Sequence, residues 1–324
     1  MKSSRFLIPV VCALLLCAPA CLFHTRTVEV RLSNAKLLTA ADQELIDRLN
    51  HDAAQIHTLN ATVDIDTEVG GEKRGKVTDF KEIRGYVLVR KPNLLRMIGL
   101  YPIVRNKAFD MVSDGNEFKL SVPATNKFYV GHNKAIKNSA NPLDSLRPQA
   151  IYDALLLQEV NPENEVAVVE SSTEMVVDSQ NKKLVKQPNY VLDVIRRTDH
   201  GWILARKVIF DRTTLRPHRQ ITFDDQGNPV TEASYQLFRD FDGVQFPGLI
   251  DIKRPQEEYD IRLIIVKLAI NQSITDDQFA LQQPIGSELV NLDERATNAN
   301  AKGSALQVPS TGTPPAANSD PPHK

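Results

Sequence analysis

Hydrophobic and polar residues alternate with a period of two along most of this chain, which is typical of β-strands with one buried face. Residues favoured in turns, mainly Gly, Asp and Asn, separate the alternating runs. The runs cover residues 60–69, 76–90, 94–98, 105–113, 116–122, 165–178, 189–198, 202–211, 216–224, 229–240, 246–253 and 259–270. They predict an antiparallel meander of about ten to twelve strands, and a sheet of this size must curl or split.

Two segments change to helical spacing. Near the N-terminus, apolar residues recur at intervals of four, four and three residues, at Leu45, Leu49, Ala53 and Ile56. Thr39 followed by Asp42 is a capping pattern for this helix. A second helix is expected over about 147–158, where Pro148 suits the first turn. Together with the strands, these helices predict one α+β domain, mostly β, over residues 40–292.

The start of the chain has the features of an export signal. Two basic residues, Lys2 and Arg5, precede an apolar run over 6–17, which is shorter than the roughly 20 residues that span a bilayer. Small residues follow and lead to Cys21. We therefore expect residues 1–20 to be a lipoprotein signal peptide and the mature chain to begin at Cys21.

Cys21 is the expected lipidation site. It is the only cysteine outside the signal, and a lone cysteine cannot form an internal disulfide. The segment resembles the lipobox Leu-Ala/Ser-Gly/Ala-Cys, although Ala18 replaces the usual Leu and Pro19 stands in the middle. As an alternative, Ala18 and Ala20 suit an ordinary secretory peptidase, which would release a soluble periplasmic protein.

Composition limits the remaining classes of function. From residue 21 onward, 37 Lys and Arg stand against 40 Asp and Glu, a mixed distribution that does not suggest nucleic-acid binding. Residues 21–39 are expected to be a linker, and residues 293–324, rich in Asn, Ala, Ser, Thr and Pro, a disordered tail. After Cys21 no apolar stretch reaches transmembrane length.

The sequence shows no motif of catalysis or metal binding. There is no G-x-S-x-G, no H-E-x-x-H and no glycine-rich phosphate loop, and the seven histidines are widely spaced. Asp64 and Asp66, like Asp240 and Asp242, lack the further oxygen donors of a calcium loop, and Asp242 before Gly243 is expected to form a turn. We therefore expect a non-enzymatic protein without cofactor or metal.

The order of several short segments resembles that in LolA/LolB-type periplasmic lipoprotein carriers, over about residues 40–292. The matching segments are LNA at 59–61, GYVLVRKP at 85–92, LLR at 94–96, VSDG at 112–115, VP at 122–123, FYVG at 128–131, DRTTLRP at 211–217, GVQFP at 243–247, VKLAIN at 266–271 and FAL at 279–281. The resemblance implies a strongly curved, half-open antiparallel β-barrel of about eleven strands, with helices covering the mouth of an acyl-chain cavity.

Two sets of residues are candidates for the site. We expect Ile261, Leu263 and Ile265, or their neighbours on the other face, to line the cavity, because residues 259–270 become apolar on both faces. Large hydrophobic residues also surround a break at Gly and Pro within 97–104. This segment resembles the loop that LolB-type proteins insert into the outer membrane. The resemblance implies a membrane-insertion loop that contains Ile98, Leu100, Tyr101 and Ile103. Alternatively, Leu100 and Tyr101 fold back onto the protein.

The resemblance implies a lipid-anchored protein at the periplasmic face of the outer membrane, which carries or receives lipoproteins or lipids by binding their acyl chains and has a periplasmic carrier as partner. Two alternatives stay open: a regulatory sensor of mislocalised lipoproteins or lipids, and a structural lipoprotein with a vestigial cavity. No lid arginine can be assigned, because Arg84, Arg90, Arg96 and Arg105 all fall in expected strands.

Overall fold

The structure, a computed structural model, describes residues 30–31, 34–71, 75–133, 147–178 and 182–294. The signal peptide, Cys21 and almost all of the expected tail lie outside these residues. The described strands are β1 (Thr58–Gly71), β2 (Lys76–Arg90), β3 (Leu94–Leu100), β4 (Lys107–Ser113), β5 (Glu117–Val122), β6 (Lys127–His132), β7 (Glu165–Val177), β8 (Leu184–Thr198), β9 (Gly201–Asp211), β10 (Arg216–Phe223), β11 (Pro229–Phe241), β12 (Val244–Arg254), β13 (Tyr259–Ile270) and β14 (Glu288–Asn291). The helices are α2 (Asp42–Ala54), α3 (Pro148–Leu155) and the short 3-10 helices η2 (Pro123–Thr125) and η4 (Asp276–Phe279).

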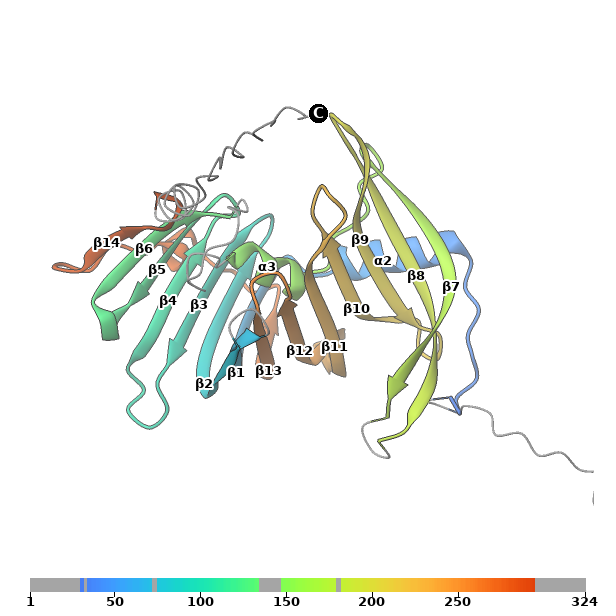
Figure 1. The fold of residues 1–324 in the computed structure, drawn as a ribbon, viewed down its shortest axis with the longest axis horizontal. Helices are drawn as coiled ribbons and strands as arrows, with labels where there is room; N and C mark the ends of the chain where they lie inside the picture. The colour runs from blue at the N-terminus through green and yellow to red at the C-terminus, as the bar shows by residue number, and fades with distance from the viewer. Residues whose placement is uncertain (1–29, 32–33, 72–74, 134–146, 179–181, 295–324) are drawn as a thin grey trace, which may run out of the picture.

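Fourteen strands of the described residues form one sheet, in the order β14-β6-β5-β4-β3-β2-β1-β13-β12-β11-β10-β9-β8-β7. Two antiparallel meanders, β1 to β6 and β7 to β13, are joined where β1 pairs with β13. The pairing of β14 with β6 is parallel. Because β14 and β7 are the two edges and do not pair with each other, the sheet is curved but open (Figure 1). The prediction of a mostly β protein with few helices is confirmed.

The structure differs from the sequence prediction in several details. The sheet has more strands than the expected eleven, because β6 and β14 were not among the alternating runs. The first helix begins at Asp42 with Ala41 as N-cap, and no side chain caps it, so the capping role of Thr39 was wrong. The second helix has Pro148 in its first turn, as expected, but ends at Leu155 because Leu156 is extended.

The two described α-helices, α2 and α3, pack on the same face of the sheet, the inner side of its curve. Ile151, Tyr152 and Leu155 of α3 join a core with the buried residues of β1, β2, β3, β12 and β13. Leu45 and Leu49 of α2 pack in a second cluster against β8 and β9. The Tyr152 hydroxyl donates a hydrogen bond to the Pro92 carbonyl at 2.5 Å, which ties α3 to the β2–β3 turn.

The chain after β13 crosses the outer face of the sheet before it forms β14. Arg90 donates a hydrogen bond to the Ile274 carbonyl and Arg96 to the Gln278 carbonyl, both at 2.7 Å. Arg90 also lies over the ring of Phe279, at 5.3 Å from its centroid. These two strand arginines therefore hold the C-terminal segment against β2 and β3.

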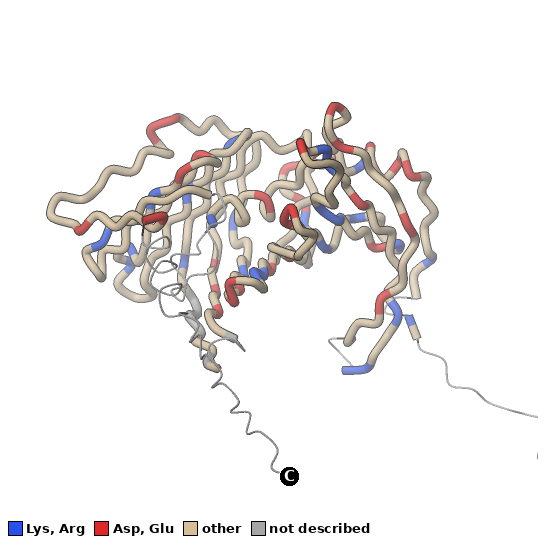
Figure 2. The backbone as a smooth tube through the Cα atoms, turned by 45° about the horizontal axis from the view of Figure 1, so that its top comes forward, with Lys and Arg blue, Asp and Glu red and all other residues tan. Residues whose placement is uncertain are grey.

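Charged residues of both signs are interspersed over the described chain (Figure 2). Many of them form ion pairs on the outer face, such as Arg84 with Asp64 and Arg262 with Asp251. Asp64, for which the sequence shows no calcium loop, is therefore paired with an arginine. Among the described helices, none is long and apolar enough to span a membrane.

Candidate binding cavities on the inner face

An apolar cavity of about 330 Å³ lies on the inner face between the first meander, β13 and α3. We refer to it as the apolar cavity. Most of its lining is hydrocarbon, and the polar exceptions are Thr67, Tyr259 and Asp260. The lining residues are Ile65, Thr67, Val69, Ile83, Met97, Ala108, Phe109, Met111, Leu120, Val122, Ile151, Tyr259, Asp260 and Ile261. A space of this size and lining suits the hydrocarbon part of a small ligand.

Two glycines shape the wall of the apolar cavity. Gly85 of β2 and Gly99 of β3 pair directly with each other across the strands. A Cβ atom at Gly99 would lie 2.2 Å from Cε1 of Phe109, and one at Gly85 would lie 2.6 Å from Cδ1 of Ile65. Phe109 and Ile65 both line the cavity. Because Gly99 and Gly85 have no side chains, Phe109 and Ile65 can lie close to the sheet, which leaves the cavity open on their other side.

Only one of the three predicted cavity residues lines the apolar cavity. Ile261 is part of the lining, whereas Leu263 and Ile265 are buried further along β13 in the core that packs against α3. All three side chains point to the inner face, whereas the sequence left open which face of β13 lines a cavity. The alternation along β13 also could not show how far along the strand α3 fills the space.

The predicted insertion loop is the turn of the β3–β4 hairpin. Ile98 and Leu100 are half-buried at the end of β3. Tyr101 is 40% exposed, Ile103 98% and Val104, which follows it, 64%. Backbone hydrogen bonds from Tyr101 N to the Asn106 carbonyl and from Val104 N to the Pro102 carbonyl, both at 2.9 Å, close the turn. The hairpin thus presents large apolar side chains to solvent next to strand residues that line the apolar cavity.

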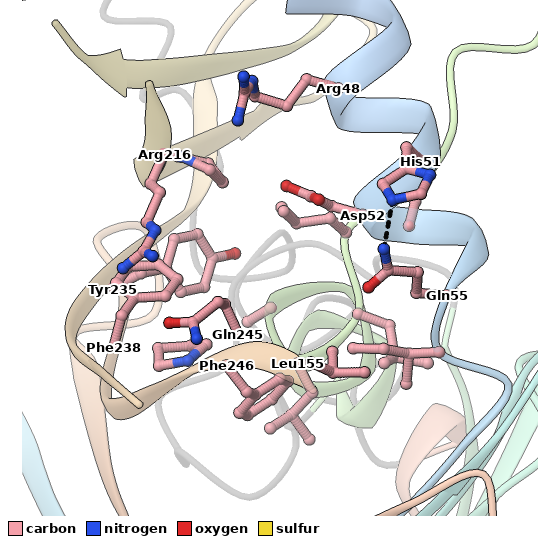
Figure 3. A pocket seen from close by; sticks show the side chains of 18 of the residues that line it. Arg48, His51, Asp52, Gln55, Leu155, Arg216, Tyr235, Phe238, Gln245 and Phe246 are labelled. Carbon is pink, nitrogen blue, oxygen red and sulfur yellow. Dashed lines mark hydrogen bonds between the residues drawn. The ribbon is translucent and has the colours of Figure 1, made fainter. Parts of the chain in front are cut away.

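A second pocket of about 330 Å³ lies between α2, the end of α3 and β10 to β12 (Figure 3). We refer to it as the arginine pocket. Its polar and charged residues include Arg48, His51 and Asp52 from α2, Gln55 at the C-cap of this helix and Arg216 from the start of β10. Its apolar and aromatic residues include Leu155, Leu156, Tyr235, Phe238 and Phe246.

The ionisable groups of the arginine pocket lie close enough to affect each other. Burial raises the pKa of Asp52, and the positive charges of Arg48, His51 and Arg216 partly oppose this rise. His51 forms a hydrogen bond with Gln55 one turn along the helix. Sequence reasoning did not identify this pocket. The spacing of Arg48, His51 and Asp52 marks one polar helix face, but no local pattern brings Arg216 to it.

A third pocket of about 570 Å³ lies between α3 and β8 to β12, and most of its lining residues are polar or charged. Its arginines are largely matched by carboxylates. Arg196 and Arg206 share the buried Glu165, at 2.8 and 3.2 Å, and Arg254 contacts Glu257 at 2.6 Å. Three arginines of this pocket therefore already have carboxylate partners within the protein.

Asp153 of α3 also lines this third pocket. Burial raises its pKa to about 6, although hydrogen bonds from Gln149 at 2.9 Å and Gln158 at 2.8 Å favour the charged form. No group of His, Cys, Asp and Glu that could hold a metal ion occurs among the described residues.

Comparison with solved structures finds LolA-type proteins. A LolA superfamily protein from Nitrosomonas europaea has 11% identity and a TM-score of 0.46, over 75% of this chain and 99% of its own. An outer membrane lipoprotein-sorting protein domain from Vibrio parahaemolyticus has 13% identity and a TM-score of 0.46, over 74% and 97%. A DUF1329 family protein from Desulfovibrio piger has 14% identity and a TM-score of 0.47, over 73% and 94%.

LolA superfamily and lipoprotein-sorting proteins are thus among the structures similar to this chain, as the sequence resemblance predicted. No family model matches the sequence, and no curated protein is significantly similar to it. With identities of 11 to 14% and TM-scores below 0.5, these likenesses assign no function to this chain.

Proposed function

We propose that this protein is a non-enzymatic carrier or receptor that binds acyl chains in the apolar cavity, with α2 and α3 covering the mouth of the half-open sheet. The observation that carries the proposal is the hydrocarbon lining of this cavity. A cavity of about 150 Å³ with such a lining holds benzene, so about 330 Å³ holds on the order of a dozen carbon atoms. Withdrawing a dozen methylenes from water gains about 10 kcal/mol, less the cost of immobilising the chain.

The β3–β4 hairpin supports a role at a membrane. Ile103 and Val104 stand out from the protein, and burying one such side chain in the acyl region gains roughly 1.5 to 3 kcal/mol. This is small beside a lipid anchor but enough to orient the protein. Because strand residues next to this turn line the apolar cavity, a chain that leaves the cavity there would enter the bilayer directly.

The proposed location is the periplasmic face of the outer membrane, with Cys21 carrying the lipid. Two or more acyl chains on one residue hold a protein firmly, whereas a single chain does so only marginally. The lipoprotein-type signal and the single mature cysteine support this anchor.

A cavity-filling variant tests the proposal. Thr67→Phe places a ring in the apolar cavity and, if it displaces about three methylenes, costs about 2.4 kcal/mol of binding, roughly 50-fold in affinity. Thr62→Phe is the matched control, because Thr62 lies on the same strand but pairs with the exposed Tyr86 on the outer face. Titration of the soluble mature chain, carrying Cys21→Ala, with a neutral fluorescent acyl-chain probe measures both variants.

We expect saturable binding to the parent chain, displacement of the probe by the monoacylglycerol monolaurin, and weak binding only by Thr67→Phe. If Thr67→Phe and Thr62→Phe bind the probe with equal affinity, the acyl chain lies outside the apolar cavity. A folded parent chain without saturable binding would refute the carrier function and leave a structural lipoprotein.

A further inference from the structure

The arginine pocket combines two kinds of surface that a single ligand would have to match. Arg48 lines it from α2, Arg216 lies beside the aromatic residues Tyr235 and Phe238, and Leu155 and Phe246 extend the apolar wall (Figure 3). A purely apolar ligand would leave the two guanidinium groups without a partner. A simple inorganic ion would leave the aromatic and aliphatic wall without a contact.

The two arginines are not matched by carboxylates in the way that other arginines of this protein are. Arg96 contacts Asp110 at 2.9 Å and Arg254 contacts Glu257 at 2.6 Å. By contrast, Arg48 approaches Glu44 only to 3.9 Å, and its buried Nε has no hydrogen-bond partner.

Arg216 lies over the ring of Phe238, at 5.6 Å from the centroid. Within the part of the chain that the structure describes, its guanidinium is in no ion pair. A guanidinium presents a planar set of donors that fits carboxylate or phosphate oxygens, and such hydrogen bonds are among the strong ones in proteins. Both side chains therefore retain donors for an anionic group.

Asp52 is the one carboxylate in the lining of the arginine pocket, and it forms no ion pair with either arginine among the described residues. The lining thus carries two arginines against one carboxylate, besides His51. Burial raises the pKa of Asp52, and the charges of Arg48, His51 and Arg216 partly oppose this rise. The charges of the pocket therefore favour an anion over a cation.

We propose that the arginine pocket is a second binding site, which takes an amphiphile with a phosphate group: the phosphate contacts Arg48 and Arg216, and the start of its hydrocarbon chain contacts Leu155, Phe238 and Phe246. The apolar cavity is not required for this site. The phosphate belongs to a lipid-like molecule and not to free inorganic phosphate, because the apolar wall is part of the pocket.

Calorimetric titration of the soluble mature chain with three compounds tests this site. Dodecyl phosphate has both the anion and the chain, monolaurin has a chain without charge, and inorganic phosphate has the anion without the chain. Arg48→Gln and Arg216→Gln each remove charge-assisted hydrogen bonds and should weaken dodecyl phosphate binding at least about tenfold. Arg197→Gln, at an exposed position of β8 outside the pocket, is the control and should change nothing.

Monolaurin binding should be unaffected by both arginine variants and weakened by Thr67→Phe, which separates this site from the apolar cavity. Dodecyl phosphate affinities that equal the parent value in both arginine variants would overturn the inference. Inorganic phosphate that binds as tightly as dodecyl phosphate would also overturn it, since the chain would then contribute nothing. If monolaurin fails to bind the parent chain while dodecyl phosphate binding still depends on the arginines, the proposed function fails and this inference stands.

Discussion

Gly99→Ala is expected to reduce the size of the apolar cavity from within the sheet. The new methyl group would lie 2.2 Å from Cε1 and 2.7 Å from Cδ1 of Phe109. The ring must therefore move by about 1.3 Å to reach an ordinary carbon–carbon separation of about 3.5 Å. Because the sheet lies behind the Phe109 ring, the ring moves into the space that the ligand would use.

The cost to stability follows from two opposing effects. Overpacking a buried position costs about 1 to 3 kcal/mol, and replacing Gly by Ala returns about 0.4 to 1 kcal/mol through the unfolded chain. A net loss of roughly 0 to 2.6 kcal/mol leaves the protein folded. If the ring takes the place of about two methylenes, binding loses about 1.6 kcal/mol, or roughly 15-fold in affinity.

Chemical denaturation and titration with the neutral acyl-chain probe measure these two effects separately. Gly131→Ala is the control, because its Cβ would meet the ring of Phe118 at 3.1 Å, outside the apolar cavity. It should leave probe affinity unchanged. The double variant Gly99→Ala with Phe109→Ala should recover the affinity that Gly99→Ala loses, since the clash is gone. Unchanged affinity in Gly99→Ala, together with a loss of stability, would refute the assignment of the ligand to this cavity.

Three further predictions concern the anchor, the hairpin and α3. Cys21→Ala should move the protein from the membrane fraction to the soluble periplasm, and failure of the parent protein to incorporate labelled palmitate would contradict the anchor. Ile103→Glu should keep the parent stability within about 0.5 kcal/mol but reduce association of the soluble chain with vesicles, whereas Leu237→Glu, at another exposed apolar position, should not; equal association would exclude insertion of the hairpin. Asp153 has its pKa raised from 3.8 to about 6, so the folded state holds its proton between these values and stability falls as pH rises from about 4 to 6. Asp153→Asn should therefore be more stable than the parent above pH 6, by about 3 kcal/mol at most, and similar to it below pH 4; urea unfolding at both pH values checks this.

The strands of this protein could be predicted where one face is buried and the other is not. The alternating runs correspond to β1 to β5 and β7 to β13. In β6 the adjacent Phe128 and Tyr129 are both buried, which breaks the alternation. β14 has only four residues and depends on contacts across the outer face that involve Arg90 and Arg96, so no local signal marks it.

The candidate sites were less predictable, because they depend on where the helices lie on the sheet. Periodicity placed Ile261, Leu263 and Ile265 on one face of a strand but did not show which face is the inner one. Only the position of α3 decides that Ile261 lines a cavity while the other two are core. In the arginine pocket, Arg48 and Arg216 come from elements far apart in sequence. They line one pocket because α2 packs against β8 and β9, next to β10.

The most direct test of acyl-chain binding in the apolar cavity is to map where the chain end lies. A monolaurin analogue with a photoactivatable diazirine at the end of its chain would be irradiated with the soluble mature chain, and the modified peptides identified by mass spectrometry. The proposed function predicts adducts on lining residues such as Met97, Met111 and Ile261, and their loss in Thr67→Phe. Adducts on outer-face residues such as Tyr86 and Ile264, or adducts that Thr67→Phe leaves unchanged, would contradict it.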